Sequence, residues 1–151
     1  MQKKIIVLAA SAMMLAGFIS ESSAATVRTS PFTDNLTITF SGFLPETVFG
    51  ASYQDNNGVN ITGPELINIG NSALVQIYSK NKVDNGYPVM TMQYPDDSGT
   101  MQTCAITFID GPWAILNYEN GVAPVCPGIS IGNISMTARH QFKLTVADSE
   151  P

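Results

Sequence analysis

The sequence contains one histidine, and this scarcity limits the chemistry that the chain can perform. With His140 alone, a site built from several histidines, or from histidine and cysteine together, cannot form, so a zinc enzyme is not expected. A glycine-rich phosphate loop is also missing. His140 precedes the last patterned strand, a position typical of a surface or strand-edge residue, and no serine spacing assigns it a nucleophile.

Basic residues are few as well. Without the first 24 residues, which we interpret below as a cleaved signal, five Lys and Arg stand against 11 Asp and Glu, a net charge of −6. The five are scattered along the chain, whereas nucleic acids and anionic membranes are bound by clustered Lys and Arg. We therefore expect neither nucleic acid nor an anionic membrane surface as a partner of this acidic protein.

The long apolar run at the start of the chain predicts a secretory signal peptide over residues 1–24. Two lysines precede the run Ile5–Ile19, and Ser22-Ser23-Ala24 supplies the small residues that signal peptidase requires. A transmembrane helix, the alternative, needs roughly 20 apolar residues, and Phe18 stands where a lipoprotein signal has cysteine. We expect cleavage after Ala24, no membrane anchor, and a secreted or periplasmic protein; the short, lysine-led signal is typical of bacteria.

The chain has only two cysteines, Cys104 and Cys126. A redox-active or nucleophilic cysteine requires a neighbouring base or a Cys-X-X-Cys spacing, and the sequence provides neither. In an exported protein two cysteines usually form one disulfide bond. We therefore predict a structural disulfide between Cys104 and Cys126.

Alternation of apolar and polar residues at a period of two predicts strands along most of the remaining chain. Clusters of Asn, Asp, Gly and Pro separate these segments, and no segment has the pattern of an amphipathic helix. About seven or eight short strands predict an all-β fold, a single antiparallel β-sandwich domain over residues 25–151, with a small β-barrel as the alternative. The expected strands are 36–40, 73–79, 87–94, 103–109, 113–118, 129–138 with a bulge at Gly132-Asn133, and 141–147. The segment 43–50 is expected as an edge strand at most, and 59–62 and 64–69 as short strands, with one helical turn beginning at Pro64 as the alternative.

Trp113, the only tryptophan, has two interpretations. It lies on the opposite face of the predicted strand from Leu116 and Tyr118, so it reaches the rim of the sheet if those two pack inward. There it would offer a ligand an aromatic surface, together with Tyr94 or Tyr53. The alternative, which we favour for the single tryptophan of a small sandwich, is a core position beside the disulfide.

Acidic residues leave a carboxylate-dependent hydrolase open as an alternative function. A glycosidase needs two carboxyl groups facing each other across a cleft, and Asp110 and Glu119 lie at the two ends of the Trp113 strand, with Asp96 and Asp97 in a nearby turn. Turns favour Asp for backbone reasons, however, so most of these residues need no catalytic explanation.

Two turns, 55–60 and 96–98, gather the oxygen atoms that calcium prefers. Neither has the glycine and glutamate spacing of an EF-hand, and turn chemistry explains their composition. We therefore expect no metal and no cofactor, and a loop calcium site remains the alternative.

The sequence favours an exported, non-enzymatic binding module that recognises a protein partner or a glycan. An exposed apolar or aromatic patch would be its mark. A fimbrial-like surface assembly subunit, joined through an unpaired sheet edge, is the second hypothesis. The carboxylate-dependent hydrolase is the third.

Overall fold

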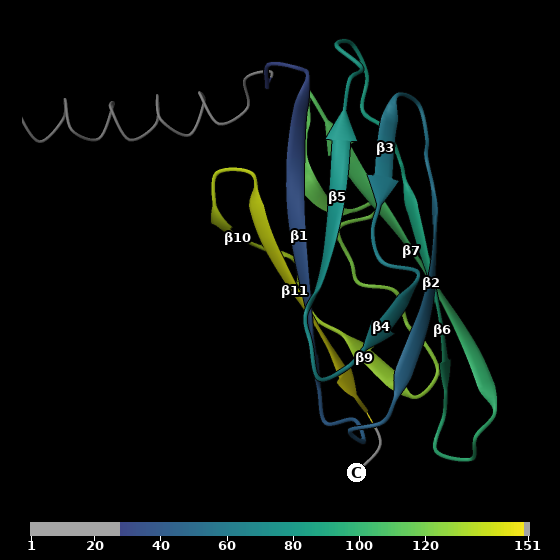
Figure 1. Ribbon diagram of the computed structural model, residues 1–151. Coiled ribbons are helices and arrows are strands. Elements are labelled where there is room, and N and C mark those ends of the chain that lie inside the picture. The colour runs from purple at the N-terminus through teal and green to yellow at the C-terminus, as the bar shows by residue number, and fades with distance from the viewer. Residues whose placement is uncertain (1–27, 150–151) are drawn as a thin grey trace, which may run out of the picture.

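The computed structural model describes residues 28–149, which form eleven strands in two facing sheets (Figure 1). The predicted signal peptide and its cleavage site lie outside the described residues. Between residues 28 and 149 the structure has no helix with the length and apolar character needed to cross a membrane. The strands are β1 (Phe32–Ser41), β2 (Val48–Gln54), β3 (Val59–Thr62), β4 (Leu66–Asn68), β5 (Ala73–Ser79), β6 (Val89–Pro95), β7 (Met101–Gly111), β8 (Ala114–Tyr118), β9 (Ile129–Ile131), β10 (Ser135–Ala138) and β11 (Gln141–Asp148).

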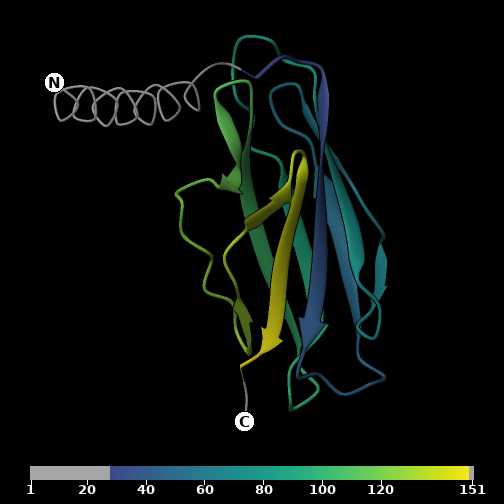
Figure 2. The same cartoon turned by 90° about the vertical axis from the view of Figure 1, so that its left-hand side faces the viewer.

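The first sheet has the order β10-β11-β1-β5-β3, and β9 also pairs with β11. Its central strand, β1, runs antiparallel to β5 and parallel to β11, so the first and last strands of the described chain lie side by side (Figure 2). The second sheet has the order β4-β2-β6-β7-β8, and all its pairs are antiparallel. The expected all-β sandwich is confirmed.

One hydrophobic core lies between the two sheets, and the predicted alternation supplies it. In most of the long strands every second side chain points inward and is almost fully buried, whereas in β2 only Phe49 is buried. The inward apolar residues of the four best-patterned strands are Ala73, Val75 and Ile77 of β5, Met90, Met92 and Tyr94 of β6, Cys104, Ile106 and Phe108 of β7, and Phe142, Leu144 and Val146 of β11.

The strand count exceeds the seven or eight that we expected. The segment predicted as one bulged strand over 129–138 is broken at Gly132-Asn133 into β9 and β10, which pair with successive parts of β11. The strand β2 begins later than the predicted segment 43–50 and extends through Gln54, because Pro45 lies outside it in a turn.

The predicted disulfide between Cys104 and Cys126 is confirmed, with the two Cα atoms 5.4 Å apart. Cys104 lies on the inward face of β7 in the second sheet. Cys126 forms an isolated antiparallel β-bridge with Ile129, the first residue of β9 in the first sheet. The bond therefore links β7 of the second sheet covalently to the segment that leads into β9 of the first sheet.

Candidate binding site

Trp113 lies at the surface, in the turn between β7 and β8, with 61% of its area exposed. The core interpretation that we favoured from the sequence is therefore wrong. The reason is the alternation along β8: Leu116 and Tyr118 are buried, so Trp113 and Ile115 fall on the outer face.

Trp113 is held in place although it is exposed. Its indole Nε1 donates a hydrogen bond to the Val83 carbonyl (2.7 Å), and its backbone N–H donates to Oδ1 of Asn85 (2.9 Å). The turn can approach Asn85 this closely because residue 111 is glycine: a Cβ at Gly111 would lie 2.7 Å from the Asn85 Cα. An anchored aromatic ring loses little conformational entropy when it binds a partner.

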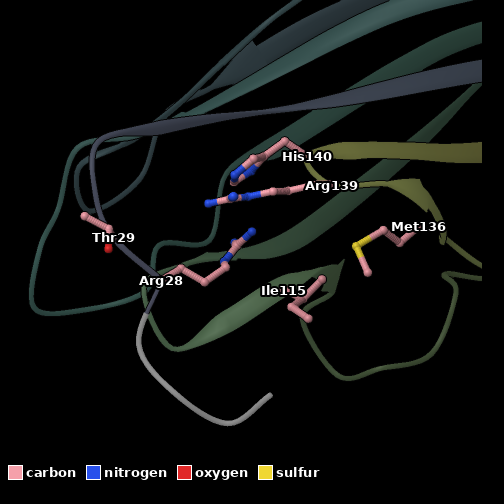
Figure 3. Close-up of a pocket in the computed structure, with 6 residues that line it drawn as sticks. All are labelled: Arg28, Thr29, Ile115, Met136, Arg139 and His140. Atoms are coloured by element: carbon pink, nitrogen blue, oxygen red, sulfur yellow. The ribbon is translucent and has the colours of Figure 1, made fainter. Parts of the chain in front are cut away.

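A pocket of about 240 Å³ lies beside this turn. Figure 3 shows its lining: Arg139 and His140 extend from the β10–β11 turn, Arg28 approaches from the N-terminal segment, and Ile115 and Met136 form the apolar side. Thr29 completes the lining. Ile115 and Met136 are 46% and 57% exposed, and Ile115 shares the outer face of its strand with Trp113. We call these three exposed side chains together the Trp113 surface.

Behind the pocket, Arg28 bridges two fully buried carboxyl groups. Its guanidinium pairs with Asp34 (3.0 Å) and with Asp110, and it also donates to the carbonyls of Gly111 and Ala114. The same group lies 4.1 Å from the centre of the Phe32 ring. The N-terminal segment is thus fastened across the β7–β8 turn by charge-assisted hydrogen bonds.

Burial and the neighbouring Asp34 raise the pKa of Asp110 to about 8, and Arg28 offsets only part of that effect. At neutral pH the two buried carboxyl groups therefore carry less than two negative charges between them. One guanidinium then comes close to neutralising the buried cluster by itself.

His140 is tied to the same cluster. Its Nδ1 lies 2.6 Å from Oδ1 of Asp34, within hydrogen-bonding distance. The residue occupies the left-handed region, with a φ of 59°, in the two-residue turn between β10 and β11. This conformation is uncommon for residues other than glycine, so the bond to Asp34 and the turn together hold the imidazole at the pocket.

The other two aromatic candidates lie elsewhere. Tyr94 is 1% exposed, stacks on Phe49 and donates its hydroxyl to the Pro127 carbonyl, so it belongs to the core. Tyr53 is partly buried in β2 and donates to the Pro64 carbonyl. Burial, and then the charge of Glu65, raise the pKa of Tyr53 to about 12. No contact between described residues brings either ring to Trp113.

The acidic candidates are also separated. Asp110 is enclosed in the buried cluster, whereas Glu119 borders a different cavity beyond the far end of β8. Oδ1 of Asp96 accepts hydrogen bonds from Ser98 and Thr100, which is the turn chemistry expected of this residue. Among residues 28–149, no three His, Cys, Asp or Glu side chains gather where they could hold a metal ion.

One further pattern, Gly128-Ile129-Ser130-Ile131-Gly132, matches the Gly-X-Ser-X-Gly spacing of hydrolase nucleophile elbows. That chemistry requires the serine at a sharp turn from a strand into a helix. Here Ser130 lies in the middle of β9 and pairs with Ala147. The spacing therefore has no catalytic geometry in this fold.

Sequence reasoning missed the buried cluster, although a signal was present. Asp34 follows Phe32 and precedes Leu36 and Ile38 at a spacing of two, and Asp110 continues the inward series of β7. A carboxyl group on the inward face of a strand requires a partner, since an unpaired buried charge is costly. No protein family, curated protein or solved structure matches this chain, so the site stands on its own geometry.

Proposed function

We propose that the protein is an exported, non-enzymatic binding module that recognises a protein partner through the Trp113 surface. The observation that supports this proposal is the anchored, exposed Trp113, with exposed Ile115 on the same outer face and exposed Met136 beside Ile115 in the pocket lining. Single exposed apolar residues are common, but contiguous ones mark interaction sites. Trp, Met and Arg are also the residue types enriched at protein interfaces.

A glycan fits the same site less well. Sugar hydroxyls both donate and accept hydrogen bonds, whereas the charged groups that line the pocket are guanidinium groups, which only donate. Aliphatic Ile115 and Met136 match apolar side chains of a protein better than a sugar ring.

Site-specific photo-cross-linking in the producing cells tests this proposal. A photoreactive phenylalanine analogue at position 113 should give a discrete adduct with another protein. The same analogue at position 66 is the control, because Leu66 is equally apolar and 73% exposed but lies on β4 at the opposite edge of the second sheet. Fractionation of the same cells tests export, with the protein expected in the periplasm or the medium.

The identity of the adduct separates the hypotheses. A foreign protein joined at position 113 and not at 66 supports the proposal. An adduct with a second copy of this chain would instead favour a surface assembly subunit. Equal labelling from both positions, or no protein adduct at 113, would contradict the binding module.

A further inference from the structure

The pocket beside the Trp113 surface contains one cation, Arg139, that has no carboxylate partner among residues 28–149. Its lining includes Arg28, Arg139 and His140 and no carboxylate. The nearest acids, Asp34 and Asp110, lie behind it and are already engaged with Arg28 and His140. A site of one charge sign attracts the opposite charge.

Arg139 is the group that can act on a ligand. Arg28 directs its donors at Asp34, Asp110 and backbone carbonyls, so few remain for a ligand. Arg139 is exposed, and no residue of the described chain, 28–149, forms a hydrogen bond or ion pair with it. A guanidinium presents paired N–H groups that match the two oxygens of a carboxylate.

The turn that carries Arg139 is fixed from below. His140, its neighbour, is bonded to buried Asp34 and adopts the left-handed conformation of the tight turn. Figure 3 shows the Arg139 side chain extending from this turn into the pocket toward Arg28. The charge is therefore presented on a rigid support, which lowers the entropic cost of binding.

The size and walls of the pocket indicate what enters it. A volume of about 240 Å³ is below the roughly 300–1,000 Å³ of sites that enclose whole small molecules, so one group of a larger ligand fits. Ile115 and Met136, which also line the pocket, match an apolar neighbour of that group.

We infer that the pocket binds a Glu or Asp side chain of the partner protein, with Arg139 as the ion-pairing group and Ile115 and Met136 packing against the apolar residues beside it. This inference rests on the proposed function and names the chemistry of the partner. The chain as a whole is acidic, so an acidic segment of the partner is attracted to this basic pocket and repelled by most of the remaining surface. This difference would orient the partner on the protein.

Two matched peptides test the inference on the ¹⁵N-labelled, exported protein. Acetyl-Leu-Glu-Leu-amide and acetyl-Leu-Gln-Leu-amide, each up to about 10 mM, differ only in the charge of the central side chain. The Glu peptide should shift the amide signals of Ile115, Met136 and residues 139–141, and should bind about five-fold more tightly than the Gln peptide. Arg139→Gln should abolish this preference. Lys143→Gln, which removes an exposed cation of β11, should leave it unchanged.

The outcomes also separate the inference from the proposed function. Equal binding of both peptides, or no shifts at the pocket, overturns the inference, and a cross-link at position 113 that persists would leave the proposed function standing. Tighter binding of methyl glucuronide than of the Glu peptide would place the carboxylate on a sugar and overturn the inference as well. Absence of a protein adduct at position 113 when all pocket residues are the natural ones would contradict the proposed function itself.

Discussion

Arg28 is the residue on which the local structure behind the pocket depends. It joins the N-terminal segment to two strands of different sheets, because Asp34 belongs to β1 and Asp110 to β7. Both carboxyl groups are fully buried. Removing one member of a buried ion pair costs more free energy than the intact pair contributes to folding, since the remaining charge stays buried without its partner.

Arg28→Ala should therefore lower the free energy of unfolding by about 3 kcal/mol. Urea unfolding followed by far-UV circular dichroism measures this loss. Arg139→Ala is the matched control: its side chain is exposed and unpaired within residues 28–149, so its effect should stay within about 0.5 kcal/mol. Equal effects of the two substitutions would show that the buried bridge does not stabilise the fold.

Asp110 should make stability depend on pH. Its pKa is about 8 in the folded chain, against 3.8 as the ordinary value, so from about pH 4 to 8 the folded state holds a proton that the unfolded state has released. Stability from this group is complete below pH 4 and declines as the pH rises to 8. Asp110→Asn cannot titrate, and the stability of the natural protein relative to this variant should fall between pH 5 and pH 8.

Thermal unfolding at both pH values measures this change. We expect the Tm of the natural protein, relative to that of Asp110→Asn, to fall by several degrees between pH 5 and pH 8, since about 1 kcal/mol corresponds to roughly 4 °C for a domain of this size. Asp96 does not interfere: hydrogen bonds from Ser98 and Gln102 lower its pKa to about 2, so its contribution changes only in more acidic solution. A Tm difference that is constant from pH 5 to 8 would show that the pKa of Asp110 is not raised in the folded protein.

At the scale of the elements, alternation in the sequence was sufficient to predict most strands and their inward faces. Met90, Met92 and Tyr94 alternate with polar residues and all three are buried, so Tyr94, which we considered as a ligand-binding residue, belongs to the core. Strand β2 was harder to predict because only Phe49 is buried along it, so no alternation is visible. The break between β9 and β10 depends on pairing with β11, which is a long-range contact that local patterns do not contain.

The candidate site was predicted less completely than the strands. The phase of Trp113 relative to Leu116 and Tyr118 allowed an exposed position as one of two interpretations, and the structure shows that position rather than the core position we favoured. The pocket, in contrast, joins Arg28 to residues more than 80 positions later in the chain. Such a meeting follows from the parallel pairing of β1 with β11, which no sequence spacing reveals.

The β7–β8 turn provides a test at this scale. Gly111 has a φ of +153°, and a Cβ there would lie 2.6 Å from Oδ1 and 2.7 Å from Cα of Asn85. Gly111→Ala should therefore destabilise the protein by about 2 kcal/mol and loosen the contact between Trp113 and Asn85. The tryptophan emission should change with it. Gly70→Ala, at a position with no heavy atom within 4 Å, should change stability by less than about 0.5 kcal/mol.

At the scale of the whole molecule, the protein divides its stability and its proposed function between different regions. The apolar core lies between the two sheets, whereas the Trp113 surface and the basic pocket are outside it and contribute little to its burial. Substitution of Trp113 should accordingly affect a partner more than the fold. The disulfide connects these regions: Cys104 is part of the core, and the loop that the bond closes contains Trp113 and all of β8.

Replacement of both cysteines by serine, Cys104→Ser with Cys126→Ser, should lower the free energy of unfolding by roughly 3 kcal/mol, since the bond closes a loop with a sequence separation of 22 residues. The inward position of Cys104 adds a small polar penalty in the variant. Urea unfolding of the natural protein with and without dithiothreitol is the control, and the reduced protein should resemble the variant. Because Arg28 fastens the β7–β8 turn independently of the disulfide, the Arg139-dependent preference for the Glu peptide should survive in the folded variant. Loss of that preference without unfolding would show that the disulfide positions the pocket.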